Sequence, residues 1–352
     1  MIWRTEITRG VCAALVVLGL DLTVLATRLS EGSGMPVAAT ADAKAVPMAA
    51  PTTTAPPPPT TTTLPPTTTT TLPPGPPWYD PARPFAWTVT PYQGLGVWID
   101  VYDWTNEITG GSPRVGVDTI DQMADQGIQT IYVQTSHRRS ASDVMEPDRL
   151  LPMIDRAHAH GMHVVAWYLP MFEDPALDLQ RLVAASNLPV DGLGVDIESL
   201  AIADPGERTR RLLELSTQLR AAVGTKVISA ITPDAVVQQV INPGFWPGFP
   251  WPEVGQVYDV VVPMAYWSVR GQPEWRSGAR YVAENIDRVR AATGRPDVPV
   301  HVAGGIADGV TAEDLIGMVD AITTRGALGG SLYDWATSNP SQWELLRALR
   351  VL

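Results

Sequence analysis

Short apolar runs alternate with longer amphipathic segments from about residue 84 to the end of the chain. Eight of these runs are rich in β-branched and aromatic residues, a composition typical of strands. They span residues 94–99, 129–134, 163–168, 192–196, 226–231, 258–264, 298–303 and 327–333. Because most of them are apolar without interruption, we expect strands that are buried on both faces.

The intervals between these strands show helical periodicity. The clearest helices are expected at 117–126, 147–160, 205–223, 278–293 and 311–325, with a final one at 341–352. The interval after the fifth strand is the weakest, since residues 242–252 are rich in Pro, Gly and Trp. Strands that alternate with helices form parallel sheets, and eight of them predict an α/β fold, a closed (β/α)8 TIM barrel. An open sheet of six or seven strands is the structural alternative.

The first 83 residues have a different composition. Residues 11–27 are almost entirely apolar and follow Arg4 and Arg9, so residues 1–30 are expected to be a signal peptide or a membrane anchor. Residues 31–83 are rich in Pro and Thr and bury too little apolar surface to fold, which predicts a disordered linker. We therefore expect a barrel domain at 84–352 that is extracellular, either secreted or anchored to the cytoplasmic membrane.

Charge and motifs exclude several functions. A net charge of -12 disfavours nucleic acid as a partner, and no glycine loop predicts a phosphate or cofactor site. The one cysteine, Cys12, lies in the apolar run, so the barrel has no disulfides. His158, His160 and His163 flank the end of a predicted helix, at the barrel end opposite the carboxyl ends of the strands. There, helix-capping roles are favoured over metal binding.

The most informative stretch is VDGLGVDIE, residues 190–198. Strand alternation puts Asp196 and Glu198 on one face, with Cα atoms about 6.6 Å apart. Acids are rarely buried unless paired or in use, and barrels carry their catalysts at the C-terminal ends of strands. The stretch therefore predicts a catalytic acid pair. A solvated strand end with two unrelated acids is the alternative.

The other strand ends are acidic and aromatic as well. The chain has 12 Trp but only 4 Phe, and indole suits the mixed surface of a sugar ring. Any single Trp is explained by core packing, but together they predict a carbohydrate groove. The candidate substrate-binding residues at the strand ends are Asp100, Asp103, Trp167, Tyr168, Met264, Trp267, Asp334 and Trp335.

Three strands resemble those of the family 18 glycoside hydrolases, the chitinases and their relatives. VDGLGVDIE is similar to their fourth-strand signature, with Gly194 in place of its middle Asp. YDVVVPMAYW, residues 258–267, resembles the sixth strand, although Trp267 stands where Asp is usual. GGSLYDW, residues 329–335, is similar to the eighth, with its Trp one residue late. The third strand lacks the family's Ser-x-Gly-Gly.

The resemblance implies a hydrolase of chitin-type or cell-wall polysaccharide that needs no cofactor or metal. Glu198 would be the general acid, and Asp196 would hold the substrate's acetamido group as that group attacks the anomeric carbon. Tyr266 would hydrogen-bond the same acetamido group. Trp335 would support the sugar ring.

Two other functions remain open. IDVYDW, residues 99–104, together with VDIE also resembles the family 25 muramidases, in which Asp100 or Asp103 would act with Glu198. A non-catalytic barrel that binds wall polymer is the other, because a fold does not determine a function.

Overall fold

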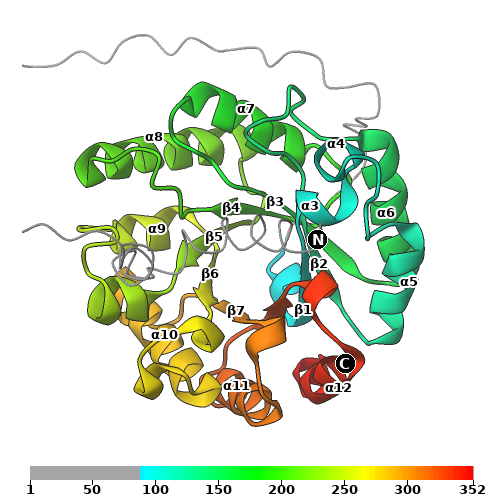
Figure 1. The fold of residues 1–352 in the computed structure, drawn as a ribbon. Coiled ribbons are helices and arrows are strands. Elements are labelled where there is room, and N and C mark those ends of the chain that lie inside the picture. The colour runs from blue at the N-terminus through cyan, green and yellow to red at the C-terminus, as the bar shows by residue number, and fades with distance from the viewer. Residues whose placement is uncertain (1–87, 352) are drawn as a thin grey trace, which may run out of the picture. The chain divides into compact units, whose positions relative to one another are not determined.

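The computed structural model describes residues 88–351, so the predictions made for residues 1–83 lie outside it. Within these residues the chain forms a closed barrel of eight parallel strands in sequential order, and β8 pairs with β1 (Figure 1). The predicted TIM barrel is confirmed. No helix in the described part is long and apolar enough to span a bilayer.

The strand positions follow the apolar runs. β1, β3 and β4 have the predicted bounds, whereas β7 begins three residues later than expected, at His301. The strands are β1 (Gly94–Ile99), β2 (Thr130–Gln134), β3 (His163–Tyr168), β4 (Gly192–Asp196), β5 (Ile228–Pro233), β6 (Val260–Ala265), β7 (His301–Ile306) and β8 (Gly329–Tyr333).

Helices surround the barrel (Figure 1). They are α3 (Val101–Trp104), α4 (Asn106–Thr109), α5 (Val117–Asp125), α6 (Pro147–Ala159), α7 (Pro175–Ser186), α8 (Pro205–Val223), α9 (Trp251–Val257), α10 (Gly278–Thr293), α11 (Ala312–Thr324) and α12 (Pro340–Leu346). α8 and α10 have the predicted bounds, and the last helix is shorter than predicted. Side-chain oxygens of Asp204 and Ser277 cap the N-termini of α8 and α10, satisfying backbone N–H groups that have no intrahelical partner.

The alternation of each strand separates two buried clusters. On β4, Leu193 and Val195 belong to the larger cluster between the strands and the helices. Trp167 and Tyr266 belong to the smaller cluster in the lumen. A short 3-10 helix, η1 (Thr90–Tyr92), closes the lower end of the barrel, where Tyr92 donates a hydrogen bond to the carbonyl of Leu193. Asp196 and Glu198, at the other end of the barrel, therefore lie above a lumen that is filled with side chains.

The segment after β5 differs from an ordinary connection. It contains a π-helical turn, η2 (Val237–Ile241), and the short helix α9. Trp246 and Trp251 lie here but are 2% and 6% exposed, and Trp246 packs edge-on against Phe172. They therefore belong to the outer core.

Candidate active site

Asp196 and Glu198 lie at the C-terminal end of β4. Asp196 is 6% exposed and Glu198 is 9% exposed. One carboxyl oxygen of each, Oδ1 of Asp196 and Oε2 of Glu198, has no hydrogen-bond partner among the described residues. Buried polar atoms normally have partners, and an unmade hydrogen bond costs about 1–3 kcal/mol. Unpartnered oxygens on two adjacent acids are features that packing alone does not explain.

Burial also changes the acidity of this pair. Desolvation raises the pKa of Asp196 far above its ordinary value. Desolvation raises the pKa of Glu198 as well, and the charge of Asp196 raises it further. Since two like charges are disfavoured in an apolar surrounding, the pair retains a proton at neutral pH. A buried carboxylic acid that keeps its proton is suited to general acid catalysis.

Tyr266 lies near this pair, at the end of β6. Its phenol is 5% exposed. Burial raises its pKa, and the charges of Glu198 and Asp196 raise it further, so the hydroxyl stays protonated and can donate a hydrogen bond. The ring centroid of Tyr266 is 5.9 Å from that of Tyr333 on β8.

Tyr333 is a mouth residue that we did not predict. Its hydroxyl donates a 2.9 Å hydrogen bond to Oδ2 of Asp100. The spacing along β8 was a usable sequence signal, because Tyr333 is two residues after Ser331. In the structure the hydroxyl of Ser331 accepts a hydrogen bond from Nε1 of Trp98 in the lumen. Alternation along β8 therefore points Tyr333 inward.

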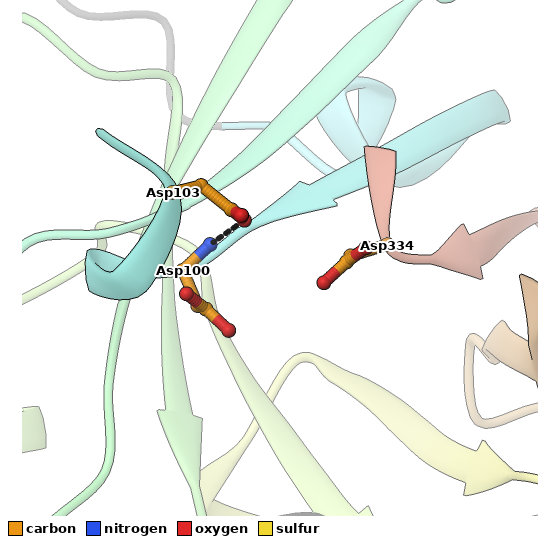
Figure 2. A group of neighbouring side chains, drawn as sticks. All are labelled: Asp100, Asp103 and Asp334. Carbon is orange, nitrogen blue, oxygen red and sulfur yellow. Dashed lines mark hydrogen bonds between the residues drawn. The ribbon is translucent and has the colours of Figure 1, made fainter. Parts of the chain in front are cut away.

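Three predicted residues, Asp100, Asp103 and Asp334, converge where β1 and β8 end (Figure 2). One oxygen from each lies within 4.8 Å of the others. Asp100 caps α3 by accepting from the backbone N–H of Tyr102, and Asp103 accepts from the N–H of Asp100. Asp334 caps the 3-10 helix η6 (Trp335–Thr337). These oxygens are close enough to share a cation. Helix capping, however, already explains why the three carboxylates lie there.

The three acids also shift one another's protonation. Burial raises the pKa of Asp100 to about 6, helped by the charge of Asp334. Burial raises the pKa of Asp103 to about 9, and the charges of Asp100 and Asp334 add to the effect. The Arg114 guanidinium partly opposes this at Asp103. The mouth therefore has an acidic side that is partly neutralised by bound protons.

Three candidate residues lie away from the acid pair. Tyr168 is in the outer cluster, where its hydroxyl donates to Asp178. Trp267 is fully buried in the same cluster, beside Gly304. Trp335 stacks on Trp343, outside the lumen. These placements do not support a substrate contact at the acid pair. Tyr168 follows the inward-facing Trp167 on β3, so alternation directs its ring outward, and Trp267 and Trp335 lie in the turns after β6 and β8.

Two further candidates, Trp167 and Met264, do face the lumen, although they are only 5% and 4% exposed. Trp167 pairs in register with Gly194, so it lies below Asp196. A Cβ at Gly194 would lie 2.8 Å from Cδ1 of Ile231 and 3.2 Å from Cβ of Trp167. The lumen therefore leaves little room for the middle Asp of the family 18 signature.

His158, His160 and His301 lie at the lower end of the barrel. Nε2 of His158 is 2.9 Å from Oδ2 of Asp191, and Nε2 of His160 is 2.6 Å from Oδ1 of Asp121. His301 is fully buried at the start of β7, with Nδ1 2.8 Å from the carbonyl oxygen of Tyr92. It does not reach the mouth because β7 begins later than predicted.

No protein-family model matches the chain, and no curated protein matches its sequence. Solved structures do share its fold. The spore cortex-lytic enzyme SleL of Bacillus cereus has a TM-score of 0.54 at 10% identity, covering 74% of each chain. The PgaB (BpsB) glycoside hydrolase domain of Bordetella bronchiseptica has a TM-score of 0.53 at 16% identity, covering 74% of this chain and 99% of that one.

A class V chitinase from Pseudomonas fluorescens has a TM-score of 0.52 at 11% identity, covering 73% of this chain and all of that one. At such identities the likeness is one of fold. The chain therefore has the barrel architecture of these three proteins, two of them enzymes by name and the third a glycoside hydrolase domain.

Proposed function

We propose that this protein is an exported glycoside hydrolase that cleaves a chitin-type or cell-wall polysaccharide containing N-acetylhexosamine. The observation that carries the proposal is the buried pair Asp196 and Glu198, with unpartnered oxygens beside Tyr266 at a barrel mouth. The named neighbours, a chitinase, a cortex-lytic enzyme and a glycoside hydrolase domain, support it at the level of fold. Export rests on the sequence of residues 1–30 alone.

In the proposed reaction Glu198 is the general acid. Its proton passes to the glycosidic oxygen as the bond from that oxygen to the anomeric carbon breaks. The substrate's acetamido oxygen attacks the same carbon, while Asp196 accepts a hydrogen bond from the acetamido N–H and Tyr266 donates one to the group. Water then adds to the anomeric carbon and returns a proton to Glu198. No cofactor takes part.

A second candidate uses two protein carboxylates, as the resemblance to muramidases implies. Asp100 favours it, because its carboxylate stands at the end of β1 and is oriented by the hydroxyl of Tyr333. In that reaction Asp100 acts with Glu198, and the acetamido group takes no part. An Asp100→Asn variant separates the two, since only the two-carboxylate reaction requires an acid there.

The direct test is an assay for new reducing ends. The purified full chain is incubated with oligomers of N-acetylglucosamine and, separately, with peptidoglycan, and a Glu198→Gln preparation serves as the control for contaminating enzymes. We expect reducing ends from at least one polymer with the unaltered protein alone. Well-folded protein that releases none from either polymer refutes the hydrolase and leaves a non-catalytic carbohydrate-binding barrel.

A further inference from the structure

We infer that the cleft between α5 and the η6–α12 segment is a second saccharide-binding site, which holds a sugar unit of a polysaccharide away from the acid pair. The cleft encloses about 450 Å³. Cavities of this size hold small ligands such as one or two sugar rings. The inference rests on the proposed function only for the choice of polymer, because binding here requires no cleavage.

An aromatic ring with a fixed orientation lines the cleft. The indole of Trp335 is half-buried, and its centroid is 5.8 Å from that of Trp343 at an interplanar angle of 21°. Trp343 also lines the cleft and is 1% exposed, so it is held by the core. A ring stacked on such a support loses little conformational entropy on binding, which favours its use as a platform.

Apart from Val115, Ala336 and Pro340, the rest of the lining is polar and comes from separate elements. Gln122 and Asp125 lie on α5, Arg114 precedes that helix, and Asn339 precedes α12. Amides both donate and accept hydrogen bonds, whereas the guanidinium donates and the carboxylate accepts. Sugar hydroxyls need donors and acceptors together, and the apolar face of a pyranose ring needs an indole. A neutral pyranose fits this combination.

The cleft is joined to the barrel mouth through the backbone. The N–H of Arg114 donates a 2.8 Å hydrogen bond to the carbonyl oxygen of Asp103, and Asp334 directly precedes Trp335. Two residues of the acidic cluster thus anchor two sides of the cleft. A chain of several sugar units is the ligand that would contact both the mouth and the cleft, whereas a single sugar would contact one.

Titration calorimetry on the full chain tests this inference. The Glu198→Gln background prevents turnover, and the probes are the hexamer and the dimer of N-acetylglucosamine. Two variants alter opposite sides of the cleft, Trp335→Ala and Gln122→Ala, and Gln218→Ala on the exposed face of α8 is the matched control. Melting temperatures verify that each variant is folded. If Trp335→Ala does not fold, Gln122→Ala, which is exposed on α5, decides the test.

We expect Trp335→Ala to weaken hexamer binding about tenfold, consistent with one lost aromatic contact, and Gln122→Ala to weaken it less. Dimer binding and the Gln218→Ala control stay unchanged. Equal hexamer affinity in all variants, equal loss for both oligomers, or no binding of the hexamer at all overturns the inference. Hexamer binding that depends on Trp335, without release of reducing ends by the unaltered protein, refutes the proposed hydrolase and leaves the site standing.

Discussion

The three carboxylates of residues 190–198 differ in their hydrogen-bond partners, and therefore in the roles they can have. Asp191 accepts hydrogen bonds from His158 and from the backbone N–H of Val164, so it connects β4 to β3 and α6 at the lower end of the barrel. Asp196 and Glu198, five and seven residues later, have unpartnered oxygens in the lumen. The sequence motif alone does not distinguish these roles, because hydrogen-bond partners come from other strands and helices.

Replacing Glu198 by Gln should abolish turnover but preserve ligand binding. The amide keeps the shape of the side chain but lacks the acid proton, and general acid catalysis contributes about 10²–10⁴-fold to rates. The measurement is the initial rate of reducing-end release beside the dissociation constant of a bound oligomer. Glu214→Gln on the exposed face of α8 is the matched control. Unchanged turnover in Glu198→Gln would show that another group is the acid.

Replacing Asp103 by Asn should stabilise the fold at about pH 8. Burial, with the charges of Asp100 and Asp334, raises the pKa of Asp103 from 3.8 to about 9. Below 3.8 the group is protonated in both the folded and the unfolded state. As pH rises towards 9, the unfolded chain ionises freely while the folded one does not, so the free energy of unfolding falls.

The Asn variant removes this loss and retains an oxygen that accepts from the N–H of Asp100. We expect its free energy of unfolding at about pH 8 to exceed that of the unaltered protein by about 1–3 kcal/mol, the usual cost of a buried group without compensation. Denaturant titrations at about pH 8 and below pH 4 measure it, and the difference should vanish at the lower pH. A variant that is less stable at both pH values contradicts the prediction.

At the scale of single elements, β4 shows how alternation and packing act together. Its inward positions carry glycines below Asp196. The space beside Gly194 is filled from neighbouring strands by Trp167 and Ile231, and the space beside Gly192 is filled by Tyr92. The small residues are required because larger side chains from β3 and β5 occupy the lumen at that level.

Gly194→Ala tests this packing. Its Cβ would approach Cδ1 of Ile231 to 2.8 Å, so we expect the free energy of unfolding to fall by about 1–3 kcal/mol, as overpacking usually causes. Gly271→Ala is the matched control, because a Cβ there meets nothing within 4 Å. Thermal or denaturant unfolding measures both variants. If the two changes have the same effect, the lumen at Gly194 is less tightly packed than the distances indicate.

Barrel closure is the property of the whole molecule that builds the mouth. β1 and β8 are the first and last strands, yet they pair, and this brings Asp100 and Asp103 beside Asp334. Several acids are thereby concentrated at one end of the barrel, in a protein whose net charge is already -12. The acidity of the mouth is therefore a consequence of topology as well as of composition.

The export proposal is tested on the N-terminal part of the chain. An export-dependent phosphatase reporter is fused after residue 83, with and without residues 1–30. We expect reporter activity outside the cytoplasm only when the apolar run behind Arg4 and Arg9 is present, since the proposal assigns the targeting signal to that run. Activity that is independent of residues 1–30 contradicts the proposal. Washing membranes with carbonate then separates an anchored product from a secreted one.

The amino-acid sequence was sufficient for the barrel. Local periodicity specifies strands and helices, and their strict alternation leaves few topologies, so β1, β3, β4, α8 and α10 were predicted with the observed bounds. Alternation also predicts Asp196 and Glu198 on one face, although β4 ends at Asp196 and Glu198 follows it. The start of β7 was missed because residues 298–300, although apolar, precede the strand.

Only the tertiary structure decided which aromatic side chains reach the mouth. Trp267 and Tyr168 are as close to strand ends in the sequence as Tyr266 and Tyr333 are, but their rings point to the helices. The pairing of β8 with β1 joins residues that are distant in sequence. The contact of Trp335 with Trp343 depends on how η6 packs against α12. Such contacts depend on closure of the whole sheet and on volumes filled by other elements, neither of which a local pattern contains.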